Sequence, residues 1–210
     1  MPMSAMMDRG MHRPVRRLAQ LYAGLVLYGA SMALQIRAGL GLDPWDVFHQ
    51  GVADHTGLSF GTVVIVTGTV VLLGWIPLRQ RPGIGTVSNV LVIGLAVDAT
   101  LALLPAAGSE PVAVAMLLAG VGLNGVASGA YIGAGLGPGP RDGLMTGLVA
   151  RTGGSIRVVR TSIEVSVLAV GAALGGTVGL GTVLYALSIG PLVHVLLPRM
   201  TVAQPAPAMA

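Results

Sequence analysis

The sequence repeats itself, and this repeat constrains the fold more than any other feature. Residues Leu21–Val97 align without a gap on Leu117–Val193, at an offset of 96 residues. Chance matching of apolar residues does not supply proline, aspartate, threonine and serine in one register. Two copies of one structural unit are therefore expected. The most telling identical pairs are Pro44/Pro140, Asp46/Asp142, Thr56/Thr152, Gly57/Gly153 and Ser59/Ser155.

Each copy contains three long apolar segments. The mean hydropathy is +0.80. Only 10% of the residues are charged, against roughly 25% in soluble domains. Segments of this length can cross an apolar core of about 30 Å. We therefore expect an all-α polytopic membrane protein with six transmembrane helices, arranged as two three-helix repeats. The segments are Leu18–Ile36, Phe60–Leu78, Ile84–Leu104, Val112–Gly133, Val158–Gly175 and Leu180–Leu197.

The repeat also predicts the organisation of the chain as one membrane domain. Residues 1–17 would be a cytoplasmic N-terminal segment, and 199–210 a Pro/Ala-rich, disordered C-terminal tail. The first apolar segment is not expected to be a cleaved signal peptide, because it has a counterpart in the second copy. The two repeats and their linker would cover residues 18–104, 112–198 and 105–111.

The orientation of the two copies follows from an odd number of spans in each. Three crossings reverse the chain, so the repeats would be inverted relative to one another. With both termini in the cytoplasm, eleven of the twelve arginines fall on the cytoplasmic side, which is the positive-inside pattern. The exception is Arg37. The cytoplasmic arginines are Arg9, Arg13, Arg16, Arg17, Arg79, Arg81, Arg141, Arg151, Arg157, Arg160 and Arg199.

Several function classes are disfavoured. The basic charge comes from scattered arginines without any lysine, and no groove-reading motif accompanies it, so no nucleic-acid partner is expected. The chain has no cysteine, which excludes disulfides and thiol chemistry. No nucleophile–base pair, phosphate loop or metal-ligand spacing is present, and His49 and His55 are poorly spaced for a shared metal. We expect no enzyme, no cofactor and no metal.

A short polar helix is predicted in each copy, over residues 44–56 and 140–152. Proline is favoured at a first helical position, and Asp46 and Asp142 would lie in the first turn. Each segment is too short to span, so it is either a re-entrant or an interfacial helix. The shared residues are explained by capping alone, but paired half-helices also form substrate sites in secondary transporters.

The charges within an apolar segment give a second candidate site. Arg160 and Glu164 are four residues apart and can pair on one helix face, with Arg157 nearby. Such a pair is either self-satisfied at the membrane surface or part of an ion or substrate site. The candidate substrate- or ion-binding residues are Asp46, His49, Asp142, Arg157, Arg160 and Glu164.

Two further features concern helix contacts inside the membrane. Asp98 and His194 occupy matching repeat positions in the third segments and are candidate buried polar residues. Gly125, Gly129 and Gly133 recur every four residues and predict a seam for close helix packing. This seam would form either a contact between the two copies or the face of a homodimer.

Five strings carry a resemblance to a known family: DPWDVFHQG, TGLSFGTV, RPGIGTV, GPRDGLMTGL and SIRVVRTSIE, in this order. They resemble the bacterial YczE membrane proteins of the wider YczE/YyaS/YitT group. The resemblance implies a multi-pass inner-membrane protein. It implies no established activity, so no site residue is carried over. Members linked to secondary-metabolite production fit either transport or a regulatory role.

Two functions remain open on the sequence. The first is a small transporter or permease that binds a small molecule or ion between the inverted repeats. The alternative is a non-transporting membrane partner or regulator, acting through the glycine seam. In both cases the lipid bilayer is a partner.

Overall fold

The computed structural model describes residues 14–202, and within this range the chain forms only α-helices. The all-helical prediction is confirmed there. Most of the predicted N-terminal segment and tail, at 1–13 and 203–210, lies outside the described residues. The helices are α2 (Pro14–Ala38), α3 (Pro44–Thr56), α4 (Phe60–Leu78), α5 (Ile84–Leu103), α6 (Glu110–Gly133), α7 (Pro140–Thr152), α8 (Ile156–Ala173) and α9 (Leu180–Met200).

Five of these helices are long and apolar enough to cross a membrane, namely α2, α4, α5, α6 and α9. Their outer faces expose large apolar side chains such as Val70, Leu95 and Leu187. An apolar surface of this kind belongs against lipid rather than water. The sixth predicted span, α8, is present as a helix but carries three charged residues, Arg157, Arg160 and Glu164.

Residues at the two ends of each short helix determine where the helix begins and ends. Asp43 and Gly139 hold extended backbone at the two N-caps, and proline follows each of them. Gly57 and Gly153 end the helices in the left-handed conformation, at φ values of 71° and 67°. A side chain is strained at such a φ, and this explains the repeated Thr-Gly pair.

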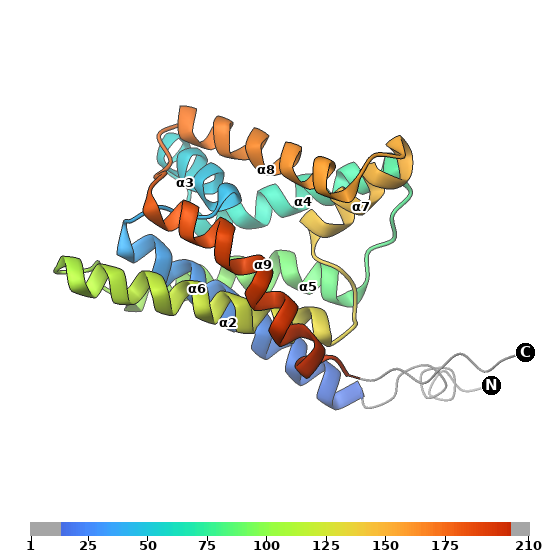
Figure 1. Ribbon diagram of the computed structural model, residues 1–210, viewed down its shortest axis with the longest axis horizontal. Coiled ribbons are helices and arrows are strands. Elements are labelled where there is room, and N and C mark those ends of the chain that lie inside the picture. The colour runs from blue at the N-terminus through green and yellow to red at the C-terminus, as the bar shows by residue number, and fades with distance from the viewer. Residues whose placement is uncertain (1–13, 203–210) are drawn as a thin grey trace, which may run out of the picture.

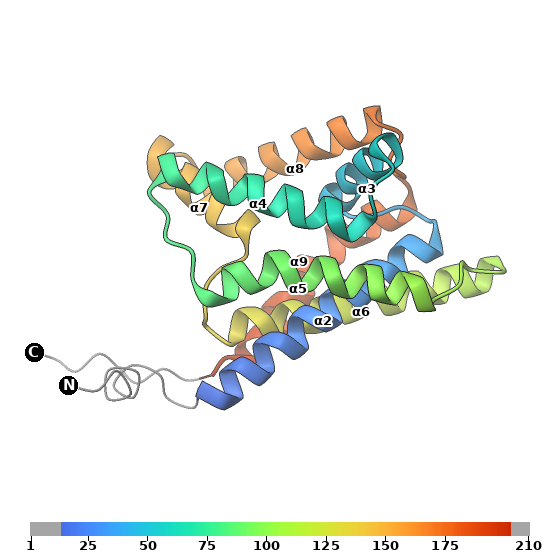
Figure 2. The same cartoon turned by 180° about the vertical axis from the view of Figure 1, so that it is seen from behind.

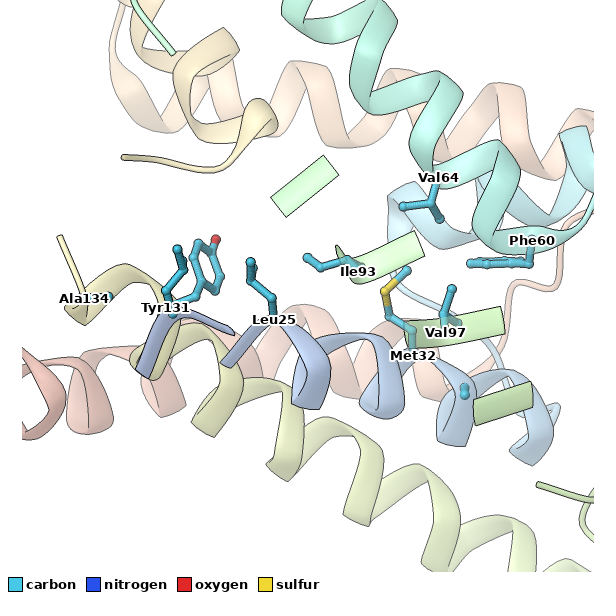
Figure 3. Packing of buried hydrophobic residues seen from close by; sticks show 10 residues of the cluster. Leu25, Met32, Phe60, Val64, Ile93, Val97, Tyr131 and Ala134 are labelled. Carbon is cyan, nitrogen blue, oxygen red and sulfur yellow. The ribbon is translucent and has the colours of Figure 1, made fainter. Parts of the chain in front are cut away.

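The most extensive helix pairing is that of α2 with α6, which lie together along one edge of the molecule (Figure 1). A Cβ atom on Gly24 would lie 2.8 Å from the backbone nitrogen of Tyr131, so the two backbones are very close. Small residues allow this approach inside a membrane. Apolar side chains from α2, α4, α5 and α6 form the main core, which includes Leu25, Met32, Phe60, Ile93 and Val97 (Figure 3).

Key contacts recur at the 96-residue offset seen in the sequence. The amide of Gly85 donates to the carbonyl of Leu136 at 2.8 Å, and the amide of Gly181 donates to the carbonyl of Leu40 at 2.8 Å. Each short helix packs on a long helix from the other half of the chain. Helix α3 lies along α8, and α7 lies along α4 (Figures 1 and 2). The two halves are thus interleaved.

The glycine seam of α6 faces α9 of the same chain. A Cβ on Gly125 would meet Leu192, and one on Gly133 would meet the backbone of Met200. Gly129 lies between them, against Leu196. The equivalent residue of Gly125 in the first half, Gly29, packs on α5 in the same manner. These glycines therefore bring helices of one chain together.

Candidate functional site

The N-terminal ends of α3 and α7 face each other inside the protein. Arg141 of α7 lies between two carboxylates of the α3 end, 3.7 Å from Asp43 Oδ1 and 3.7 Å from Asp46 Oδ1. Both aspartate side chains are buried, at 2% and 1% exposure, and Arg141 is half-buried. One guanidinium therefore serves two buried carboxylates, and it comes from the other half of the chain.

Asp43 is held in place by its role as a helix cap. Its Oδ1 accepts hydrogen bonds from the amides of Trp45 at 2.9 Å and Asp46 at 3.1 Å. These are amides that a helix start leaves without partners. Its Oδ2 is buried and has no hydrogen-bond partner among the described residues. The cap thus presents one unpaired carboxylate oxygen.

Arg141 is also held by an aromatic face. Its guanidinium carbon lies 4.8 Å from the ring centroid of Trp45, within the range of a cation–π contact. Trp45 and Arg141 occupy equivalent repeat positions, 96 residues apart. The two halves of the chain therefore meet at equivalent positions, and the residue there is tryptophan in the first copy and arginine in the second.

His49 lies one turn further along α3 and completes the buried group. Its Nδ1 is 3.1 Å from Asp46 Oδ1. The ring packs edgewise against Phe48 and Phe60, with Trp45 nearby. Burial lowers the pKa of His49 to about 3, and the Arg141 charge acts in the same direction. The imidazole is therefore neutral at pH 7, and its Nδ1–H donates to the Asp46 carboxylate.

The pKa values of the two aspartates are shifted upward, in the opposite direction to that of His49. Burial raises the pKa of Asp43 to about 7, the neighbouring Asp46 adds to this shift, and Arg141 opposes it. Burial also raises the pKa of Asp46 to about 6, against the pull of Arg141. Two carboxylates that share one guanidinium leave one negative charge in excess. A proton on Asp43 removes that excess.

These residues line one end of a cavity of about 280 Å³. Tyr131 reaches the cavity from α6, and its hydroxyl lies 3.4 Å from Asp142 Oδ2. Arg160 and Glu164 reach it from α8 and pair at 2.8 Å. The wall formed by α4 and α5 is largely apolar. The cavity therefore combines a polar end with an apolar side.

The structure brings most of the predicted site residues together. His49, Asp142, Arg160 and Glu164 line the cavity, and Asp46 lies behind its wall, against His49. Arg157 is exposed on α8 and does not line the cavity. The short helices and the α8 charge pair, two separate candidates in the sequence, thus form a single site.

The two predicted intramembrane polar residues lie elsewhere. Asp98 accepts hydrogen bonds from Ser59 Oγ at 2.6 Å and from the Gly61 amide at 2.7 Å. It therefore joins α5 to the start of α4. His194 is exposed on α9. Their matching repeat positions do not give them matching roles.

Three residues of the site were absent from the sequence-based set: Asp43, Trp45 and Arg141. Asp43 precedes Pro44, and this N-cap position was the available signal. The signal for the other two was that a tryptophan and an arginine stand at equivalent positions of otherwise similar polar stretches. Among the described residues, no group of three or more His, Asp or Glu side chains is arranged to hold a metal ion.

Comparison with known proteins places the chain in a family. A protein family described as "Family of unknown function (DUF6198)" matches residues 15–198. A Haemophilus influenzae protein named "Uncharacterized protein" is 40% identical over 179 residues, covering 85% of this chain and 82% of that protein. The Bacillus subtilis "Uncharacterized membrane protein YczE" is 35% identical over 189 residues, covering 88% and 87%. No solved structure matches. The chain therefore belongs to this family of YczE-type membrane proteins, as the resemblance predicted.

Proposed function

We propose that this protein is a small secondary transporter, and that its substrate site is the cavity where the N-terminal ends of α3 and α7 meet. The observation that carries the proposal is the buried group of Asp43, Asp46 and Arg141, contributed by both halves of the chain. Ionisable groups inside a membrane protein are costly, and they are typical of substrate and ion pathways.

The arrangement of the short helices supports a re-entrant geometry. Their N-terminal ends, at Asp43 and Pro140, are buried, and their C-terminal ends, at Thr56 and Thr152, are exposed. Half-helices whose ends meet inside the protein are a recurring plan of transporters with inverted repeats. In this proposal the two halves are inverted and the short helices enter from opposite membrane faces.

The proposal includes α8 as the sixth span. Its charged residues Arg160 and Glu164 line the cavity and pair with each other, which lowers the cost of placing them in a membrane segment, although 55% and 39% of their side-chain surface is exposed. Apart from Arg141 and Arg160, which line the cavity, the arginine distribution supports cytoplasmic termini and a location in the inner membrane. Such a protein binds and releases its substrate without a chemical step, and we propose no enzymatic activity.

Access to the cavity from both membrane faces tests the proposal without knowledge of the substrate. The chain has no cysteine, so a Met145→Cys variant carries a single thiol on the cavity wall. A membrane-impermeant maleimide is applied to right-side-out and to inside-out vesicles. Transport predicts labelling from both sides, because a transporter opens its site alternately to each face.

The control is Ala150→Cys, an exposed position at the far end of the same helix. It should be labelled from one side only. If Met145→Cys were also labelled from one side only, the transport proposal would fail, and a membrane partner or regulator with a one-sided pocket would take its place.

A further inference from the structure

Resting on the proposed transport function, we infer that the substrate is a small organic cation, an ammonium with an apolar body, which replaces a proton held by Asp43. The inference follows from the charges around the cavity, from the unpaired oxygen of Asp43 and from the apolar wall opposite. It names the substrate class of the site and the ion that is exchanged for it.

The charged groups around the cavity are unequal in number. Four carboxylates oppose two guanidiniums, and His49 is neutral. Negative charge is thus in excess, and binding of a cation relieves it, whereas binding of an anion increases it. The carboxylates belong to Asp43, Asp46, Asp142 and Glu164, and the guanidiniums to Arg141 and Arg160.

The two guanidiniums are already engaged. Arg160 is paired with Glu164 at 2.8 Å. Arg141 lies between two carboxylates and against the face of Trp45. At Arg160 an anionic substrate would have to compete with the partly exposed Glu164. At Arg141 it would have to displace Asp43 or Asp46 and leave a buried carboxylate unpaired. That loss is expensive, so the cavity disfavours anions.

The unpaired oxygen of Asp43 gives the cation its place. Asp43 lines the cavity, its side chain is 2% exposed, and its Oδ2 has no partner among the described residues. A buried acceptor without a donor is unfavourable, and a charged donor makes the strongest hydrogen bond to a carboxylate. An ammonium N–H supplies that donor.

The remainder of the cavity suits an apolar body. Val64, Val90 and Ile93 line the side formed by α4 and α5, and Tyr131 adds an aromatic ring. The volume of about 280 Å³ lies at the small end of ligand pockets, which span roughly 300–1,000 Å³. An amine with one ring or a short alkyl chain fits better than a larger molecule.

The proton follows from charge balance. Several ionisable groups face Asp43: Asp46 and His49 on α3, Arg141 on α7, Tyr28 on α2 and Tyr185 on α9. Only Arg141 among them is a cation at pH 7. In the empty site a proton on Asp43 removes one of the two excess negative charges. When an ammonium binds, that proton passes to water, and the charge of the site is unchanged.

Three probes of one shape test the inference on the purified full-length protein: phenethylammonium, 2-phenylethanol and 3-phenylpropionate. Thermal unfolding reports binding, because a ligand of the folded state stabilises it. Proton release is followed with a pH dye in weak buffer near pH 6.5. We expect stabilisation by the ammonium alone, with release of up to about one proton per chain.

The decisive variant is Asp43→Asn, which keeps the cap, since asparagine is as good an N-cap as aspartate. It should fold, lose the stabilisation by phenethylammonium and release no proton. Exposed Asp54→Asn is the matched control and should behave as the wild type. The inference is overturned if the carboxylate probe stabilises more than the ammonium, if no probe binds, or if Asp43→Asn still releases a proton. Two-sided labelling of Met145→Cys together with any of these results would leave transport standing and reject the cation.

Discussion

The two short helices are equivalent in the repeat but differ where they meet. Both begin with proline, carry an aspartate in the first turn and end at a left-handed glycine. The residues that differ are those at the meeting point. Helix α3 brings Asp43, Trp45 and His49, where α7 has Gly139, Arg141 and Met145. The shared residues define the helix and contribute Asp46 and Asp142 to the site, and the unshared residues make the site asymmetric.

This difference shows how a repeated unit acquires a polar site. If both copies carried the α3 residues, four aspartates would meet without a cation. Replacement of one tryptophan by Arg141 supplies a cation and keeps the other ring, Trp45, as its stacking partner. Asp54 and Arg151 also differ between the halves, but they are exposed and lie outside the site.

The two packing interfaces of the short helices show a second exchange. On α4, the buried Trp75 fills the space above Gly143 of α7 and donates its indole N–H to the carbonyl of Pro140 at 3.0 Å. At the equivalent place on α8 the glycine is on the long helix, where Gly171 lies against Val47 of α3. In the α4–α7 interface the bulky residue is on the long helix and the glycine is on the short helix. In the α3–α8 interface the glycine is on the long helix and the bulky residue is on the short helix.

The largest effect is expected from Arg141→Ala. This change leaves the buried Asp43 and Asp46 without a cation, and loss of one member of a buried pair costs about 3–5 kcal/mol. The thermal unfolding midpoint in detergent should fall strongly. The control, Arg157→Ala, removes an exposed arginine of α8 that does not line the cavity, and it should change little. Equal effects of the two variants would contradict the central role of Arg141.

The next largest loss of stability is expected for a substitution of Gly171 in the α3–α8 interface. A Cβ atom at Gly171 would overlap the backbone of Phe48 on α3, and backbone atoms cannot move aside locally. Gly171→Ala should therefore destabilise the protein by about 1–3 kcal/mol. Gly122→Ala is the matched control on α6, because a Cβ atom there would have no neighbour within 4 Å and alanine is the better helix former. A Gly171→Ala protein as stable as Gly122→Ala would show that α3 does not pack closely on α8.

An exchange of Trp45 and Arg141 should show that the effects of the two residues on stability are coupled. Trp45→Arg is expected to destabilise because it removes the ring that stacks on Arg141. Arg141→Trp is expected to destabilise because it removes the guanidinium between Asp43 and Asp46. The double variant restores one guanidinium and one indole, with the cation now on α3. The double variant should be more stable than either single one, by about 0.5–3 kcal/mol in a double-mutant cycle. Additive effects would mean that the pair does not act as a unit.

The last prediction concerns pH. The folded-state pKa of Asp43 is about 7, above its ordinary value of 3.8. The contribution of Asp43 to stability is therefore complete below pH 3.8 and is lost as the pH rises toward 7. The unfolding midpoint of the wild type minus that of Asp43→Asn should fall between pH 5 and about 7.5. A difference that is constant or rises with pH would contradict a proton on Asp43. His49 is present in both proteins, so its opposite contribution to the pH dependence of stability cancels in the difference.

Much of the fold was predictable from the sequence, because helix bounds depend on local chemistry. Proline after the cap and glycine at the end of Pro44–Thr56 and Pro140–Thr152 specify both short helices. The long apolar segments specify the others. The interleaving of the halves, with α3 on α8 and α7 on α4, depends on tertiary packing that no local pattern encodes.

The site was predictable only in part. Glu164 and Arg160 were identified because charge is rare in an apolar helix, and Asp46 because it is repeated. Asp43 and Arg141 are not repeated, and their partners lie about a hundred residues away in the chain. Alignment of the two copies shows that these positions differ, but it does not show that Arg141 contacts Asp43.

The central claim is that α3 and α7 enter from opposite faces of the membrane and meet at their N-terminal ends. Single cysteines at Asp54 and Ala150 test it most directly, because these equivalent, exposed positions lie on the last turns of the two helices. In right-side-out vesicles an impermeant maleimide should label Asp54→Cys and not Ala150→Cys, and in inside-out vesicles the reverse. Labelling of both from the same side would contradict the account.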